Sequence, residues 1–185
     1  MRAAGVVFFL FTVIIACSNK STQFDRIGIK VDNIYVNEVE KSDTIRYLPS
    51  IAYHCTLRSR YDSTINIQGK NYYSEGKPEA NFYLINSKDT LGLFLVTDKS
   101  LKVNPKEEFH FTLATSPIGV VDLLEKYGYS VEHRSKPNKL TEVEFLKKIA
   151  RESFMLFEWR GHKRKIRDLK KVKINYRDPN NHVIE

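Results

Sequence analysis

The chain contains 185 residues, of which 28% are charged and 42% hydrophobic, and its formal net charge at pH 7 is +8. This length indicates one domain that can bury a core of its own. Only two cysteines are present, Cys17 and Cys55. They exclude the framework of several disulfides that holds many small secreted domains together.

Residues 1–20 have the pattern of an export signal. Arg2 supplies a positive charge, residues 6–16 form a mostly apolar run, and the small residue Ala16 precedes Cys17. A charged start, a short apolar core and a small residue before the cut are typical of a secretory signal peptide. The run is shorter than the roughly 20 apolar residues that a permanent transmembrane helix needs.

The end of this signal, Ile14-Ile15-Ala16-Cys17, resembles the lipobox of bacterial lipoproteins. In that family the lipobox cysteine receives a diacylglyceryl group on its thiol, a peptidase cuts before it, and the new amino group is usually acylated. The resemblance implies that residues 1–16 are removed and that Cys17 carries the acyl chains that anchor the protein to a membrane. Two or more chains give stable anchoring, whereas one does not. An ordinary signal peptide cut after Ala16 and an uncleaved anchor are the alternatives.

Cleavage before Cys17 would remove 16 of the 185 residues and leave 169, with a formal net charge of +7 because Arg2 is lost. Lipidated Cys17 could not pair with Cys55, so the core alone would hold the fold. Residues 17–26 are then the lipidated cysteine and a polar tether. Ser18 stands where Asp would favour retention in the inner membrane of some bacteria, so the resemblance favours the outer membrane.

From Ile27 the apolar residues alternate with the period of two that is typical of strands. The phase of this alternation changes between Val31 and Ile34, which predicts a β-bulge or bend. Residues 81–86 and 90–97 are expected to form a hairpin. Further strands are expected at residues 50–58, 64–68, 109–113, 154–160 and 172–176.

Two helices are expected within an insertion at residues 116–152. Ser116-Pro117 combines a hydroxyl cap with a proline in the first turn, and Gly128 suits the C-terminal end. Thr141 and Glu144 have the spacing of a capping box. The apolar stripe of the first helix is formed by Ile118, Val120, Val121, Leu123, Leu124 and Tyr127. The buried side of the second helix is formed by Val143, Leu146, Ile149 and Ala150.

Strands, then two helices, then strands predict a mainly β fold with an α insertion. We expect an antiparallel β-sandwich, for which an immunoglobulin-like topology is one candidate, with the two short helices inserted before the last strands. A single globular domain would span residues 27–179, followed by a C-terminal tail at 180–185.

Seven cations crowd the twelve positions from Arg160 to Lys171, opposed only by Asp168. They are Arg160, Lys163, Arg164, Lys165, Arg167, Lys170 and Lys171. Such a cluster attracts anionic lipid heads, acidic glycans or nucleic acid, and export argues against nucleic acid. We expect a basic hairpin that contacts an anionic partner; the alternative is a solvated hairpin tip whose lysines protect a sheet edge.

A second candidate contact surface lies in the loop at residues 69–79, where Tyr72 and Tyr73 are adjacent. Both cannot face inward on a regular strand, so one is expected at the surface, where tyrosine is a good contact residue for glycans or protein. The alternative is a tyrosine at a sheet edge that packs on its neighbours.

Three short segments resemble the O-glycosylation motif of exported Bacteroidetes proteins, in which Asp precedes Ser or Thr. The resemblance implies glycan attachment at Thr44, Ser63 and Thr90. An Asp followed by Thr or Ser is also ordinary chemistry where a turn leads into a strand.

No familiar catalytic motif is present in the sequence, and no two of the five histidines lie within four residues of each other. No metal site, cofactor or catalytic residue is therefore expected. Alternation places Cys55 on the apolar face of its strand, which predicts a small buried hydrophobe rather than a catalytic thiol.

These features predict a lipid-anchored binding or assembly module of the bacterial cell envelope without catalytic activity. Its partners would be a membrane through Cys17 and an anionic lipid, a glycan or an envelope protein. A small envelope enzyme that acts on glycan or peptide, and a periplasmic inhibitor or immunity protein, are the alternatives.

Overall fold

The computed structural model describes residues 26–41, 46–71, 77–96, 100–129, 140–166, 168–177 and 183–184. The strands are β1 (Ile27–Lys41), β2 (Arg46–Ser59), β3 (Ile65–Gln68), β4 (Ala80–Ile85), β5 (Thr90–Leu95), β6 (Ser100–Val103), β7 (Glu108–Thr115), β8 (Phe154–Trp159), β9 (His162–Ile166), β10 (Ile174–Arg177) and β11 (Val183–Ile184). The helices are α2 (Pro117–Lys126), α3 (Leu140–Glu152) and the short 3-10 helix η3 (Asp168–Lys171).

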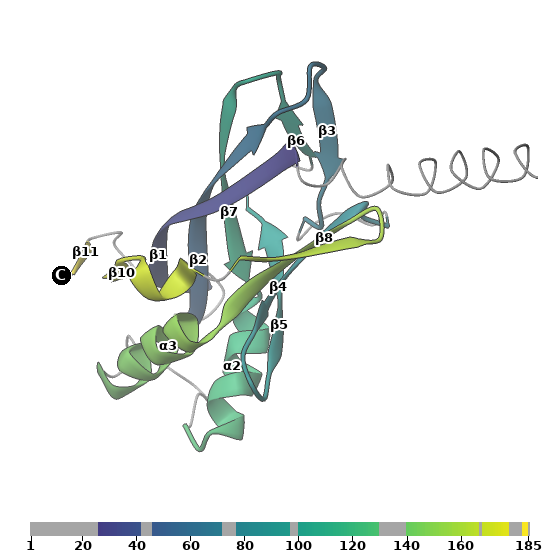
Figure 1. Ribbon diagram of the computed structural model, residues 1–185. Coiled ribbons are helices and arrows are strands. Elements are labelled where there is room, and N and C mark those ends of the chain that lie inside the picture. The colour runs from purple at the N-terminus through teal and green to yellow at the C-terminus, as the bar shows by residue number, and fades with distance from the viewer. Residues whose placement is uncertain are drawn as a thin grey trace, which may run out of the picture.

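Among the described residues, nine strands form one curled sheet in the order β11-β10-β1-β2-β7-β5-β4-β8-β9, and β3 pairs with β6 in a small second sheet. Figure 1 shows α2 and α3 together at one end of the molecule and the β3–β6 pair at the other. The predicted class, a mainly β, sandwich-like fold with a helical insertion, is confirmed.

One strand pair departs from the expected antiparallel arrangement, because β10 runs parallel to β1. The other strand pairs of the described residues are antiparallel. A hairpin forces neighbouring strands to run in opposite directions, whereas a long connection leaves either direction open. Because β10 follows β1 only after both helices, its direction was not set by local sequence.

The predicted irregularity in the first strand is a β-bulge. Val31 lies opposite Cys55 and Asn33 lies opposite His54, so Asp32 is the extra residue. A bulge bends its strand and re-aims a side chain, and it therefore explains the change in apolar phase.

The core combines side chains of the large sheet with side chains of the β3–β6 pair and of both α-helices. Tyr53, Phe82 and Phe157 are among its largest fully buried side chains, and the rings of Phe82 and Phe157 stack at a centroid distance of 4.9 Å. Cys55 is 2% exposed, as its strand pattern predicted.

The helices form where expected. Ser116 is the N-cap residue of α2, Pro117 lies in its first turn, and Gly128 follows its end with a φ of 84°, but the predicted side-chain caps are wrong. The Ser116 side chain makes no capping hydrogen bond, and its main-chain carbonyl accepts a hydrogen bond from the Val120 N–H. The second helix already begins at Leu140, so Thr141 lies within its first turn. The Glu144 carboxylate pairs with Lys147 instead, at 3.0 Å.

The predicted buried faces are confirmed fully for α3 and partly for α2. Val143, Leu146, Ile149 and Ala150 are all buried. In α2 the residues Val120, Leu123 and Leu124 are buried, and the wider stripe is wrong at its margin, since Ile118 is 64% and Tyr127 is 37% exposed.

Candidate functional site

The basic segment forms a hairpin at the edge of the large sheet. Trp159 pairs with His162, so Arg160 and Gly161 alone make the turn between β8 and β9. Their φ angles are 50° and 79°. Positive φ at both central residues defines the type I′ turn, whose twist matches that of a hairpin. β9 is an edge strand of the large sheet. Its lysines therefore disfavour pairing of this edge with a strand of another molecule.

The cations of this hairpin fall on two faces. Lys163 and Lys165 are exposed and share one face of β9, because side chains alternate along a strand. Lys163 lies 3.7 Å from Glu158, and the Lys165 ammonium lies 4.8 Å from the centroid of the Phe154 ring. We call these two lysines the β9 lysine face.

Arg164 occupies the opposite face of β9 and joins two strands that are distant in sequence. Its guanidinium donates a hydrogen bond to the main-chain carbonyl of Ile27, at the start of β1. Arg164 therefore has a structural contact that its sequence neighbours Lys163 and Lys165 do not share.

The remaining predicted cations are spread along the connection. Arg160 lies over the Trp159 ring at 4.8 Å and 3.7 Å from Glu79. Lys170 and Lys171 are exposed on η3. Arg167 lies outside the described residues.

A pocket of about 410 Å³ lies between the hairpin turn and β3, lined in part by Tyr61, Ser63, Asn66, Arg160 and His162. The lining also includes the apolar side chains of Ile65 and Trp159.

A larger pocket of about 600 Å³ lies between β1 and the chain from β9 to β10, and we call it the seam pocket. Its charged residues are Lys30, Asp32, Lys171 and Lys173. Its aliphatic residues are Ile29, Val31, Ile166, Leu169 and Val172. The cationic segment identified in the sequence therefore borders a concave site that also draws on β1.

The bulged residue Asp32 takes part in a hydrogen-bonded line across β1, β2 and β7. The Thr56 hydroxyl donates to the Asp32 carboxylate, and His110 Nδ1 lies 3.0 Å from the same hydroxyl. Lys30 also binds this carboxylate, at 2.7 Å. Burial alone would raise the pKa of Asp32, but the hydrogen bonds from Lys30 and Thr56 outweigh it, and the pKa lies below its usual value.

The direction of these hydrogen bonds limits the chemistry that Asp32, Thr56 and His110 can carry out. Ionised Asp32 only accepts hydrogen bonds, so the Thr56 proton is committed to it and His110 must donate through Nδ1. A nucleophile needs a neighbouring base that accepts its proton. This geometry therefore joins three strands and does not activate Thr56 through His110.

His54 on β2 and His110 on β7 differ in exposure. His110 is exposed, whereas His54 is half-buried, with its ring 4.7 Å from that of Tyr35. The Arg177 guanidinium lies over the Tyr35 ring, 4.2 Å from its centroid. Burial, followed by the charge of Arg177, lowers the pKa of His54 and favours the neutral imidazole.

Cys55 is enclosed by the core and is not available as a nucleophile. Its thiol lies 3.6 Å from the Tyr53 carbonyl, and burial raises the pKa of the thiol far above its ordinary value. Because the thiolate is the reactive form, a buried thiol of this kind is inert.

The structure describes only some of the residues in the predicted glycosylation sites and in the tyrosine loop. Ser63 and Thr90 are exposed, at the turn before β3 and at the start of β5. Cys17, Thr44, Tyr72 and Tyr73 lie outside the described residues, so their predicted roles stay predictions.

Within the described part of the chain, no group of three or more His, Cys, Asp or Glu side chains is placed to hold a metal ion. None of the helices described there has the length and apolar character needed to cross a bilayer. No protein-family model matches the chain, and comparison with curated proteins and with solved structures found no match.

Proposed function

We propose that the protein is a lipid-anchored binding module of the bacterial envelope that contacts an anionic surface through the β9 lysine face. The observation that carries this proposal is the pair Lys163 and Lys165, exposed on one face of an edge strand. The lipobox-like sequence at Cys17 supports the membrane as the place of attachment.

The two lysines remain available to an outside anion. The Lys163–Glu158 pair is long, at 3.7 Å, and the Lys163 side chain is 60% exposed. Exposed pairs of this kind contribute only about 0–1 kcal/mol, so an anionic ligand can compete with Glu158. Each cation held near an anionic membrane adds about 1 kcal/mol of binding free energy, which falls off within a Debye length.

The contact between Arg164 and Ile27 supports a position of the hairpin near the membrane. It brings β9 against the start of β1, where the expected tether joins the domain. Residues 18–26 separate Cys17 from this point, and a chain of that length spans at most about 30 Å when fully extended. A lipid on Cys17 would thus keep the β9 lysine face close to the headgroups.

The proposal is tested by sedimentation of a soluble form that begins at Ser18 with vesicles containing phosphatidylglycerol. The variant Lys163→Glu/Lys165→Glu should bind at least about tenfold more weakly than the wild type at low salt, because two attractive cations become repulsive. Binding by the wild type should weaken from low to physiological salt. Arg164 is left unchanged because it contacts β1.

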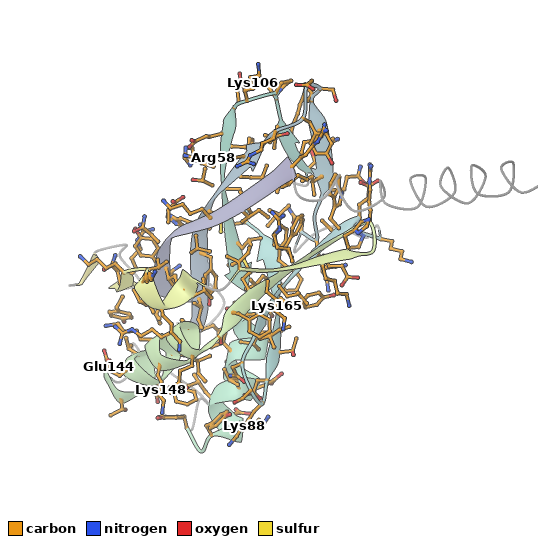
Figure 2. The ribbon with its side chains drawn as sticks, viewed as in Figure 1. Arg58, Lys88, Lys106, Glu144, Lys148 and Lys165 are labelled. Atoms are coloured by element: carbon orange, nitrogen blue, oxygen red, sulfur yellow. The ribbon has the colours of Figure 1, made fainter. Side chains whose placement is uncertain are left out.

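The matched control is Lys88→Glu/Lys106→Glu, which changes the net charge by the same amount. Both residues are exposed, and Figure 2 shows them at opposite ends of the molecule with Lys165 between them. Equal loss in both double variants would mean that net charge alone drives binding, and the β9 lysine face would lose its role. A parallel titration with a soluble acidic polysaccharide distinguishes a glycan from a lipid surface.

A further inference from the structure

The seam pocket occupies a gap along one edge of β1. On that edge β1 pairs with β10 only from Ile34 to Asn37, and the Ile34 N–H donates to the Lys173 carbonyl. At the other end of the gap, Arg164 binds the Ile27 carbonyl. Residues 29–32 lie between these two contacts and line the pocket. Among the described strands, none pairs with this stretch of the edge.

The walls of the pocket are aliphatic. Ile29, Ile166 and Val172 are half-buried and pack on the core, while Leu169 is fully buried beneath them. Of the described residues that line the pocket, none is aromatic. Sugars are commonly held against aromatic faces, whereas a hydrocarbon chain gains free energy from burial against any apolar wall.

The rim of the pocket is cationic. It carries three lysines and one aspartate, and Lys30 already binds Asp32 at 2.7 Å. Among the described lining residues the lysines outnumber the aspartate by two, and Lys171 and Lys173 lie on the η3–β10 side of the pocket. Since Thr56 also binds Asp32, that carboxylate is held at the opposite side of the pocket by partners of its own.

We propose that the seam pocket binds an amphiphilic anion, with its head at Lys171 and Lys173 and its aliphatic chain against Ile29, Ile166 and Val172. The volume of about 600 Å³ is within the range of about 300–1,000 Å³ that is typical of small-molecule sites. A phosphate head or a carboxylate head on an alkyl chain satisfies this chemistry. The inference does not depend on the β9 lysine face and stands or falls separately from it.

The test is photolabelling of the full chain in an uncharged detergent with a dodecyl phosphate that carries a diazirine on its alkyl chain. Peptide mapping should find the label at residues 29–32 and 166–172. Excess dodecyl phosphate should compete, and dodecanoate tests whether a carboxylate head is also accepted. Inorganic phosphate should not compete at equal concentration, because it lacks the chain.

Two variants test the head and the chain separately. Lys171→Gln/Lys173→Gln should reduce labelling about tenfold or more, since charged hydrogen bonds are lost. Val172→Asn should reduce it while leaving the cations in place. The controls Lys88→Gln/Lys106→Gln and Lys163→Glu/Lys165→Glu should label like the wild type. Circular dichroism and the melting temperature establish that each variant is folded.

Labelling outside the two segments, or labelling unchanged in Lys171→Gln/Lys173→Gln, would overturn the proposal. Competition by inorganic phosphate as strong as that by dodecyl phosphate would also overturn it, because the aliphatic walls would then have no role. Normal labelling in a protein that fails to bind vesicles would reject the proposed membrane contact and keep the seam pocket.

Discussion

At the scale of residues, single polar side chains join strands that are far apart in sequence. Thr56 links Asp32 to His110 across three strands, and Arg164 links β9 to β1. The sequence showed these residues only as polar positions within strands or a cationic run. Which of them meet depends on strand order and on the bulge, and neither is encoded by spacing along one segment.

Cys55 gives a residue-scale prediction about the core. Cys55→Ala should lower the free energy of unfolding by about 1–2 kcal/mol, because it removes a small buried group. Cys55→Asp should lower it by about 3–5 kcal/mol, because it buries a charge without a partner. Urea unfolding of the form that begins at Ser18 measures both values.

Asn66→Asp is the control for the Cys55 variants, since it introduces the same carboxylate at an exposed strand position. It should change the unfolding free energy little. If Cys55→Asp were no more destabilising than Asn66→Asp, Cys55 would have to be accessible to water.

At the scale of elements, the longer strands with apolar alternation were predictable, whereas some short or highly charged strands were not. The expected hairpin at residues 81–86 and 90–97 is present as β4 and β5. No strand was expected at β6, at β9 or at β11, which lies within the predicted C-terminal tail and pairs with β10. β6 has four residues, and β9, with the sequence HKRKI, has almost no apolar positions. The charges that suit β9 to a sheet edge also remove the periodic signal by which a strand is recognised.

The turn between β8 and β9 gives an element-scale prediction. Gly161 has a φ of 79°, and a Cβ placed there would meet nothing within 4 Å. Gly161→Ala should therefore cost about 1–2 kcal/mol through backbone strain alone. The change should appear as a lower urea midpoint.

Gly28→Ala in β1 is a matched control, because a Cβ at Gly28 also meets nothing within 4 Å and its φ is not in the left-handed region. This substitution should be neutral or stabilising, since alanine loses less conformational freedom than glycine on folding. Equal unfolding free energies for the two variants would contradict a type I′ turn at Arg160 and Gly161.

At the scale of the whole molecule, the start of β1 lies close to both β9 and the seam pocket. The start of β1, to which the expected tether connects, contacts β9 through Arg164. The seam pocket lies along the same edge of β1. This proximity is why a lipid at Cys17 would matter for both proposed contacts.

The anchor gives the prediction at this scale. Cys17→Ala should abolish incorporation of labelled palmitate in a host that processes lipoproteins, and should leave a precursor longer by 16 residues. Gel electrophoresis with fluorography measures both effects. Cys55→Ala is the matched control, because Cys17 and Cys55 are the only cysteines, and it should be labelled like the wild type. Undiminished labelling of Cys17→Ala would place the lipid elsewhere.

The sequence by itself determined the features that depend on local pattern. They include the mainly β class, the bulge after Val31, the two helices with the buried face of α3, and the burial of Cys55. Each follows from a period of 2 or 3.6 in apolar residues, because one buried face imposes that period on a strand or helix.

Only the tertiary structure decided the parallel pairing of β1 with β10, the separation of Arg164 from Lys163 and Lys165, and the seam pocket. These features arise where segments more than 100 residues apart meet along an edge of β1. The local periodicity of apolar residues does not encode such a contact. The contact depends on how the sheet curls and on which strand the chain reaches after its helices.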